Sequence, residues 1–207
     1  GIDPIAECSR PLKTRKYRVQ YQETDFTFLC RLLEAAGITF YHRTEEGQSR
    51  LVLADAPERG QERSAALAFS DQPVAGQLYA TGFRASRTLT AGRIAIADHD
   101  HRLQNMPLVA DADANKNPTE ARLESFSYEP GAFRYGNPGT KDTPVADDRG
   151  RTRTDLGEAQ RLAGQKAAAA MARARRFTFD SNALDLAPGM RLSIGQHAMA
   201  DKVGQLL

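Results

Sequence analysis

The chain has 207 residues, of which 41% are apolar and 26% charged, the composition of a globular protein that can bury a core. Lysine and arginine number 28 against 26 aspartates and glutamates, and the net charge of +2 excludes a strongly basic nucleic-acid-binding protein. The sequence has no run of 18 apolar residues and so does not indicate a membrane-spanning helix. The two cysteines, Cys8 and Cys30, do not make a disulfide framework.

Residues 17–37 predict a strand that leads into a short helix. The alternation of polar and apolar side chains over Tyr17–Tyr21 is typical of a strand. Thr24 is placed to cap the helix, and Asp25 brings a negative charge into the first turn, where the helix dipole favours it. Gly37 supplies the left-handed residue at which such a helix ends.

The apolar side chains of this helix predict that one of its faces packs in the protein core. Phe26, Leu29 and Leu33 recur at steps of three and four residues, and Cys30 is expected to be a buried small hydrophobic residue. Next along the chain, strands at residues 38–41 and 50–54 flank a turn at residues 45–48. This pattern predicts a hairpin.

A second hairpin is predicted between Gln77 and Ala97, because two β-compatible runs flank Ala91–Gly92. Residues 110–153 are rich in aspartate, asparagine, proline and glycine. They predict long loops around a single strand at residues 121–128.

The clearest helix is predicted over Asp155–Arg175 and contains a run of alanines. Strands are predicted at residues 176–179 and 190–194, joined through a turn at residues 186–189 that contains proline and glycine. Together the predicted elements indicate a mixed α+β fold in which strands predominate.

The residue types that carry catalysis or bind metals do not form a recognised motif in this sequence. Asp98–His101 places two histidines on one face of a strand, and it is expected to be a solvated strand end. Residues 111–122 resemble the start of a calcium loop, but lysine and arginine occupy the positions that require glycine and glutamate. We therefore expect no catalytic residue, cofactor or metal site, although two distant carboxylates could still converge into a hydrolytic pair.

Residues 19–43, VQYQETDFTFLCRLLEAAGITFYHR, resemble the signature of the VgrG family, the spike proteins of the bacterial type VI secretion system. The family pattern is Q-Y-x-E-[ST]-D-x-x-F-x-x-R-L-x-E-x-x-G-I-x-[YF]-x-[YF]. It is matched at Gln20, Tyr21, Glu23, Thr24, Asp25, Arg31, Leu32, Glu34, Gly37, Ile38 and Phe40. His42 replaces the last aromatic residue of the pattern.

Three later pieces resemble the same family in the same order. Residues 92–100 resemble a strand that ends in an aspartate-aromatic-aspartate step, with His99 at the aromatic position. Residues 124–133 resemble the piece E-x-Y-x-Y-P-G-x-F, and residues 185–189 resemble the L-x-P-G turn after the long helix. The resemblance extends from Tyr17 to Leu207 and is shared with the tail hubs of contractile bacteriophages.

The resemblance implies a structural, non-enzymatic part of a homotrimeric spike with hub-like β-barrel subdomains. Its implied partners are further copies of the same chain, an Hcp-like hexameric tube protein, baseplate proteins and effector proteins. It implies neither nucleic-acid binding nor stable insertion into a membrane. Such a spike is assembled in the bacterial cytoplasm and is then injected into target cells. A phage-type tail hub and a tail-associated cell-wall hydrolase are the alternatives.

Three segments are expected along the chain, which we interpret as a fragment of a longer protein. Residues 1–110 would form the first part of the hub domain, residues 111–153 a loop-rich segment with one strand, and residues 154–207 the long helix and the closing strands. The family-signature residues with expected structural or interface roles are Tyr21, Glu23, Asp25, Phe26, Arg31, Glu34, Gly37, Tyr128, Pro130, Gly131, Pro188 and Gly189.

Overall fold

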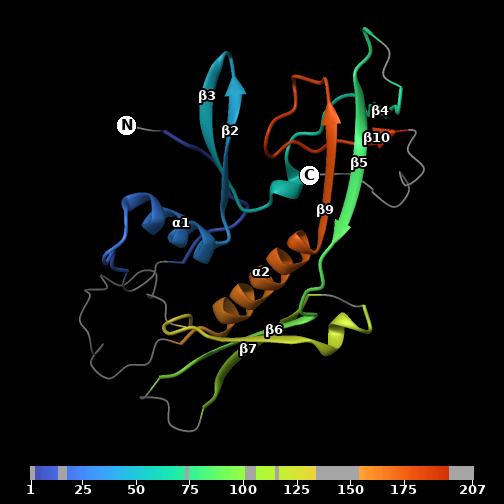
Figure 1. Cartoon of the computed structure of the whole chain (residues 1–207). Helices are drawn as coiled ribbons and strands as arrows, with labels where there is room; N and C mark the ends of the chain where they lie inside the picture. The colour runs from blue at the N-terminus through green and yellow to red at the C-terminus, as the bar shows by residue number, and fades with distance from the viewer. Residues whose placement is uncertain are drawn as a thin grey trace. The chain divides into compact units, whose positions relative to one another are not determined.

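The computed structural model describes residues 3–13, 18–72, 75–100, 106–114, 117–133 and 154–195 (Figure 1). The chain falls into two compact units, each built from discontinuous segments. Unit 1 comprises the described residues of 1–10, 36–86 and 176–207, and unit 2 those of 11–35 and 87–175. The boundaries expected at residues 110 and 153 stay a prediction.

The first sheet of unit 1 is a hairpin extended by a short parallel strand. Its strands are β1 (Ile5–Glu7), β2 (Thr39–Glu45) and β3 (Gln48–Ala54), in the order β1-β3-β2. Glu45 pairs with Gln48, and the two residues between them, Glu46 and Gly47, have φ angles of 50° and 76°. Positive φ at both turn positions is typical of the tight turn whose twist matches that of a hairpin. The predicted hairpin is confirmed.

The second sheet of unit 1 has the order β10-β4-β5-β9. Its strands are β4 (Leu67–Phe69), β5 (Tyr79–Arg87), β9 (Arg175–Ser181) and β10 (Ile194–Gly195). Leu67, Ala80 and Ile194 are buried in its core, and the rings of Phe83 and Phe177 stack there with their centroids 5.6 Å apart. The predicted strand at residues 176–179 is confirmed, whereas that at 190–194 overlaps β10 only at Ile194.

Gly82 interrupts the regular alternation of β5 on the side of this core. Ala80 and Phe83 both contact the core, although strict alternation would place residues three apart on opposite faces of the strand. Gly82 has a φ of 58°, a conformation that glycine adopts at β-bulges. A Cβ atom at this position would lie 2.8 Å from a carboxylate oxygen of Asp180. Glycine therefore allows the strand to change its inward face.

Unit 2 is a three-stranded sheet with a long helix on one face. The strands are β6 (Arg93–Asp98), β7 (Leu108–Asp113) and β8 (Glu124–Tyr128), in the order β7-β6-β8, and the helix is α2 (Leu156–Ala174). Ile96, Leu108 and Phe133 form the core together with Ala159 and Leu162 of the helix. Short 3-10 helices lie at Pro57–Arg59 in unit 1 and at Glu120–Arg122 in unit 2.

The start of α2 is fixed by its capping residue. The side chain of Asp155 accepts a hydrogen bond of 3.1 Å from the backbone N–H of Glu158 and also contacts Lys13. The buried residues Ala159, Ala163 and Ala167 recur every four residues and bring the helix close to β6 and β7. The helix predicted over residues 155–175 is confirmed.

The strand predicted over Tyr17–Tyr21 is wrong within residues 18–21; Tyr17 lies outside the described residues. The Val19 carbonyl accepts a 3.2 Å hydrogen bond from the Arg31 guanidinium, and the Gln20 side chain bonds the Glu23 carbonyl at 3.0 Å. The hydrogen bonds of this segment are therefore made with side chains rather than with a neighbouring strand. The alternation of the sequence could not reveal that.

The hairpin predicted between Gln77 and Ala97 is also wrong, because β5 and β6 belong to different sheets. The residues between them bond to distant parts of unit 2. The Thr88 N–H donates to the Ala174 carbonyl at 2.9 Å, and the Gly92 N–H donates to the Glu120 carbonyl at 2.9 Å. A short-range turn pattern carries no information about such partners.

The loop predicted from residue 110 is wrong at its start, where β7 continues to Asp113 and pairs antiparallel with β6. The aspartates favoured a loop in the sequence, yet in the strand they alternate with Ala110 and Ala112, which pack towards the helix. The strand expected at residues 121–128 is confirmed over Glu124–Tyr128, as β8, whereas Glu120–Arg122 is a short 3-10 helix.

The fold is mixed α+β with strands predominating and two α-helices, as predicted. In the part of the chain that the structure describes, each of the three sheets is open rather than closed into a barrel.

Candidate interaction surface

The signature segment builds a helix with well-defined ends. Helix α1 spans Asp25–Ala36. The Thr24 hydroxyl accepts a 3.2 Å hydrogen bond from the Thr27 N–H, and the Thr24 carbonyl accepts one of 2.9 Å from the Phe28 N–H. Gly37, at a φ of 70°, follows its last residue. The predicted cap, the first-turn acid Asp25 and the glycine terminator are confirmed.

The polar residues of the signature join the segment before α1 to the helix through an ion pair and hydrogen bonds. Two nitrogens of Arg31 bond the two carboxylate oxygens of Glu23, at 3.3 Å and 2.5 Å, and the guanidinium lies 5.2 Å from the centre of the Phe28 ring. The Gln20 amide donates to Asp25 at 2.8 Å. Arg31 and Glu23, both signature residues, thus form an ion pair.

Acid should weaken the ion pair between Arg31 and Glu23. The hydrogen bond from Arg31 is the main cause that lowers the pKa of Glu23 below its ordinary value of 4.5. Because the pKa is lower in the folded state, the stabilisation is complete above pH 4.5 and is lost as the pH falls through the lowered value. We expect Glu23→Gln to remove this part of the pH dependence of the unfolding free energy, measured by urea titration between pH 5 and 2. An unchanged acid dependence would contradict the assignment.

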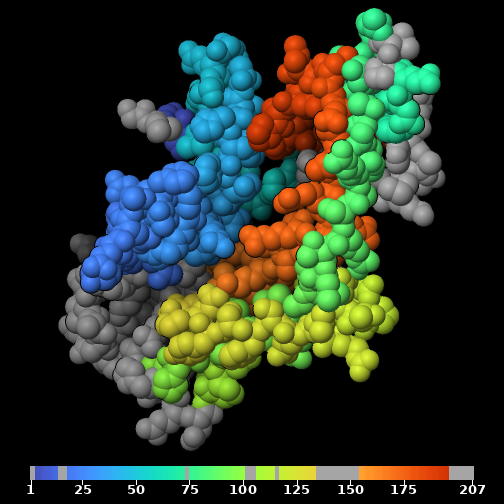
Figure 2. Space-filling view, viewed as in Figure 1, coloured from blue at the N-terminus to red at the C-terminus, as the bar shows by residue number. Residues whose placement is uncertain are grey.

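The apolar side chains of α1 are not core residues in the single chain, so that prediction is wrong. Phe26 is 63% exposed, Leu29 is 47% exposed, and α1 has no fully buried residue. Cys30 is only partly buried. The helical period identified the apolar side of the helix, but it carries no information about what covers that side. Figure 2 shows α1, in blue, at the surface of the molecule.

Tyr21, four residues before the helix begins, is also an exposed aromatic residue, at 75%. Glu34 is exposed as well. The surface formed by Tyr21, Phe26 and Leu29 is termed the α1 surface below. Exposed aromatic and leucine side chains on an internally braced element are typical of a protein–protein contact.

A second group of signature residues lies where β8 ends. Tyr128 is the last residue of β8 and is 56% exposed, and Pro130 and Gly131 form the turn that follows. The Asp98 carboxylate accepts hydrogen bonds from the backbone N–H groups of Gly131, at 3.0 Å, and Phe133, at 3.4 Å. The Pro–Gly turn is thereby tied to the end of β6.

This contact corrects the expectation of a solvated strand end at Asp98–His101. Asp98 and Asp100 are both buried, at 8% and 2% exposure, whereas His99 is exposed as expected and His101 lies outside the described residues. Asp98 also accepts a 2.8 Å hydrogen bond from the His99 N–H. A carboxylate after a strand is ordinarily exposed, and only the sequence-distant turn explains its burial.

Removal of the Asp98 carboxylate should therefore destabilise unit 2. Asp98→Ala leaves the N–H groups of Gly131 and Phe133 without their acceptor, at a cost of about 3 kcal/mol. Asp98→Asn keeps one acceptor oxygen and should lose less. Urea unfolding of both variants measures the difference, and equal stability of Asp98→Ala and the unchanged chain would refute this role.

The third group, Pro188 and Gly189, forms a tight turn beneath a tyrosine. The Met190 N–H donates to the Ala187 carbonyl at 3.2 Å, and Gly189 has a φ of 77°. A Cβ atom on Gly189 would lie 2.4 Å from the Tyr41 ring, a residue of the first sheet. The predicted turn is confirmed, and its glycine has a packing reason.

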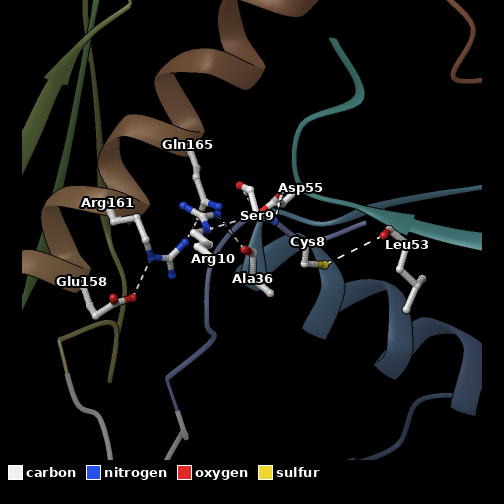
Figure 3. A network of polar contacts seen from close by, with 9 residues as sticks. All are labelled: Cys8, Ser9, Arg10, Ala36, Leu53, Asp55, Glu158, Arg161 and Gln165. Atoms are coloured by element: carbon white, nitrogen blue, oxygen red, sulfur yellow. Dashed lines mark hydrogen bonds and ion pairs between the residues drawn. The ribbon is translucent and has the colours of Figure 1, made fainter. Parts of the chain in front are cut away.

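Figure 3 shows a polar network around Asp55 that sequence reasoning missed. Both carboxylate oxygens accept from the Ser9 N–H at 3.0 Å, and Arg10 forms an ion pair with Asp55 at 3.7 Å. The hydrogen bond from the Ser9 backbone is the main cause that lowers the pKa of Asp55. Arg10 also donates at 3.3 Å to the carbonyl of Ala36, the last residue of α1. An aspartate directly after a strand was the sole signal in the sequence.

These groups show no arrangement of ligands or catalytic residues. Nowhere in the described residues do three histidine, cysteine, aspartate or glutamate side chains come together to hold a metal ion. Neither described α-helix is long and apolar enough to cross a membrane.

Comparison with known families decides the assignment. The family model of the phage tail baseplate hub (GPD) matches residues 2–207, almost the whole chain. The chain belongs to this family. The baseplate hub family is a structural one, which agrees with the mixed fold and the exposed α1 surface described above.

Similar proteins include spike proteins from Pseudomonas aeruginosa. The baseplate hub chain is 46% identical over 48 residues to the type VI secretion system spike protein VgrG1a, a match that covers 23% of this chain and 8% of that protein. It is 28% identical over 132 residues to the spike protein VgrG5, covering 60% of this chain and 16% of that protein. The matches thus span less than a fifth of these relatives.

A solved structure is also similar, the 43 kDa tail protein of prophage MuSo2 from Shewanella oneidensis. The identity is 14% and the TM-score 0.43, with 95% of the baseplate hub chain and 52% of that chain covered.

Proposed function

We propose that this chain is part of the hub of a VgrG-like spike of a type VI secretion system. In this role three copies assemble into a homotrimer that sits on a hexameric, Hcp-like tube. The chain is not an enzyme and acts through its shape. Membership of the baseplate hub family and the similarity to two Pseudomonas aeruginosa spike proteins support this function.

The α1 surface is the observation that carries the proposal. Its polar residues are bonded within the segment, through Arg31 to Glu23 and through Gln20 to Asp25. Its apolar residues remain largely exposed in the single chain. A helix that is internally fixed yet presents Phe26 and Tyr21 outward is suited to a permanent contact between subunits.

The remaining partners follow from the same role. Baseplate proteins would hold the hub during assembly in the bacterial cytoplasm. Injection with the spike would then deliver effector proteins into a target cell, where the hub arrives as part of the puncturing device. These assignments follow from the resemblance to the spike proteins of type VI secretion systems.

A phage-type tail hub is the second candidate, favoured by the description of the matching family. Binding to tube proteins distinguishes the two. We expect the full-length protein to bind the hexameric tube protein of a secretion system in a sedimentation assay. Binding only to a phage-type tube protein from the same genome would replace the secretion role with the phage role.

The cell-wall hydrolase alternative requires a carboxylate pair. No observation among the described residues favours one. Cleavage of purified peptidoglycan by the full-length protein, abolished by single carboxylate substitutions in this chain, would reverse the non-enzymatic assignment.

A further inference from the structure

Among the residues that the structure describes, strand β8 has one unpaired edge. In the described part of the chain it pairs with β6 alone and ends the order β7-β6-β8. Ser125 and Ser127 are opposite Ile94 and Ile96, of which Ile96 packs in the core with α2; Ser127 is partly buried and Ser125 is exposed. Glu124, Phe126 and Tyr128 lie on the other face and are exposed, Phe126 at 62%. An open edge that carries exposed aromatic side chains invites a further strand.

Strand β9 presents a second open edge of matching chemistry. It ends the order β10-β4-β5-β9 and pairs with β5 alone within the described residues (Figure 1). Phe177 and Phe179 pack against the core of unit 1. Arg176, Thr178 and Asp180 alternate with them and are exposed, and the Arg176 side chain has no acidic partner among the described residues.

The charges of these two edges are complementary in one orientation. Parallel pairing with Glu124 opposite Arg176 places Phe126 opposite Thr178 and Tyr128 opposite Asp180. The same register sets Ser125 and Ser127 opposite Phe177 and Phe179, so the core-side faces of both sheets continue into each other. Antiparallel pairing around Phe126 and Thr178 would place Glu124 against Asp180, and like charges directly opposite are destabilising.

The other acidic edge is less suited to this role. Strand β7 carries Asp111 and Asp113, but Asp111 is paired with Arg93 at 3.2 Å. The side-chain amide of Gln160, on α2, also occupies the backbone carbonyl of Asp111. Glu124 forms a longer ion pair with Arg93, at 3.6 Å, with both side chains about half exposed. Both exposed pairs contribute little and can be replaced, so the hydrogen bond from Gln160 is what makes the β7 edge less suited.

We propose that the β8 edge of one copy of this chain pairs in parallel with the β9 edge of a second copy, through Glu124 and Arg176. The inference rests on the proposed homotrimer and names an interface within it. Because the two edges differ, the contact is head-to-tail. Three copies close a ring if each copy offers its β8 edge to one neighbour and its β9 edge to the other. Pairing along β8 and β9 adds backbone hydrogen bonds to the apolar contact at the α1 surface.

Disulfide cross-linking tests this pairing in the full-length protein. In a background with Cys8→Ser and Cys30→Ser, we introduce Glu124→Cys together with Arg176→Cys. Opposite residues on adjacent strands lie within the Cα separation that a disulfide needs, about 4.4–6.8 Å. We expect species of two and three chains on an SDS gel without reductant, and a single chain after reduction.

The matched control combines Glu124→Cys with Asp180→Cys, which are opposite each other only in antiparallel pairing. It should remain a single chain, and each lone cysteine variant should give at most a minor dimer. Light scattering of the Cys8→Ser and Cys30→Ser background, in which any further cysteine of the full-length protein is also replaced by serine, separates two failures. A single-chain mass refutes the proposed trimer. A trimeric mass without cross-linking of the first pair, or with equal cross-linking of the control, refutes the β8–β9 pairing alone.

Discussion

Substitution of Gly189 by alanine should destabilise the chain by about 2–5 kcal/mol. The residue has a φ of 77°, a conformation that costs a non-glycine residue about 1–2 kcal/mol. The added Cβ would also lie 2.4 Å from the Tyr41 ring, and an overpacked contact of this kind costs about 1–3 kcal/mol. Tyr41 cannot simply rotate outward, because its ring is buried against Val52 and Ala54.

Gly164→Ala is the matched control for this prediction. Gly164 lies within α2, and nothing is close to the position that its Cβ would take. Alanine should stabilise the helix there by about 0.5–1 kcal/mol. Urea unfolding of both variants measures the contrast. If Gly189→Ala matched the stability of the unchanged chain, the packing of the Pro–Gly turn under Tyr41 would be wrong.

Substitution of Phe26 by aspartate should dissociate the assembly without unfolding the chain. Phe26 is 63% exposed and lies in the first turn of α1, where a carboxylate is favoured by the helix dipole. Within an assembly the substitution would remove the buried aromatic ring of Phe26. This loss weakens each subunit contact by about 2 kcal/mol, or roughly thirtyfold in its association constant. Light scattering measures the mass, and circular dichroism checks that the helix content is unchanged.

Leu184→Asp makes the same chemical change at a control position. Leu184 is fully exposed in the loop between β9 and β10, outside the α1 surface. The Leu184→Asp protein should have the same mass in solution as the unchanged protein. Dissociation by both substitutions would show a general effect of added charge, and dissociation by neither would remove the α1 surface from the interface.

Elements with local signals were predictable from the sequence. Thr24 and Gly37 mark the ends of α1, Gly47 marks the hairpin turn, and Asp155 marks the start of α2. Each of these residues acts on a backbone group within a few positions of itself, so a short window of sequence contains the whole cause. The family resemblance was likewise carried by such a window, residues 19–43.

Elements that depend on distant partners were not predictable. Asp98 is buried because it binds the turn at Gly131, 33 residues further along the chain. Strand β7 forms despite its aspartates because it pairs with β6 and because its alternate alanines pack in the core with α2. Composition and period describe a segment by itself, whereas burial is set by what packs against it.

The candidate interaction surface shows the same division. The spacing of Phe26, Leu29 and Leu33 correctly identified an apolar helix face, but its assignment to the core assumed a partner within the same chain. Exposure of that face in the folded chain moves the expected partner to another subunit. Arg31 and Glu23 are both part of the signature, but only the structure shows that they pair with each other.

The mass of the full-length protein in solution, measured by light scattering at micromolar concentration, tests the central claim most directly. A hub of the proposed kind predicts the mass of three chains, unchanged on moderate dilution. A stable single-chain mass under the same conditions would contradict the trimeric spike and leave the baseplate hub fold without the proposed assembly.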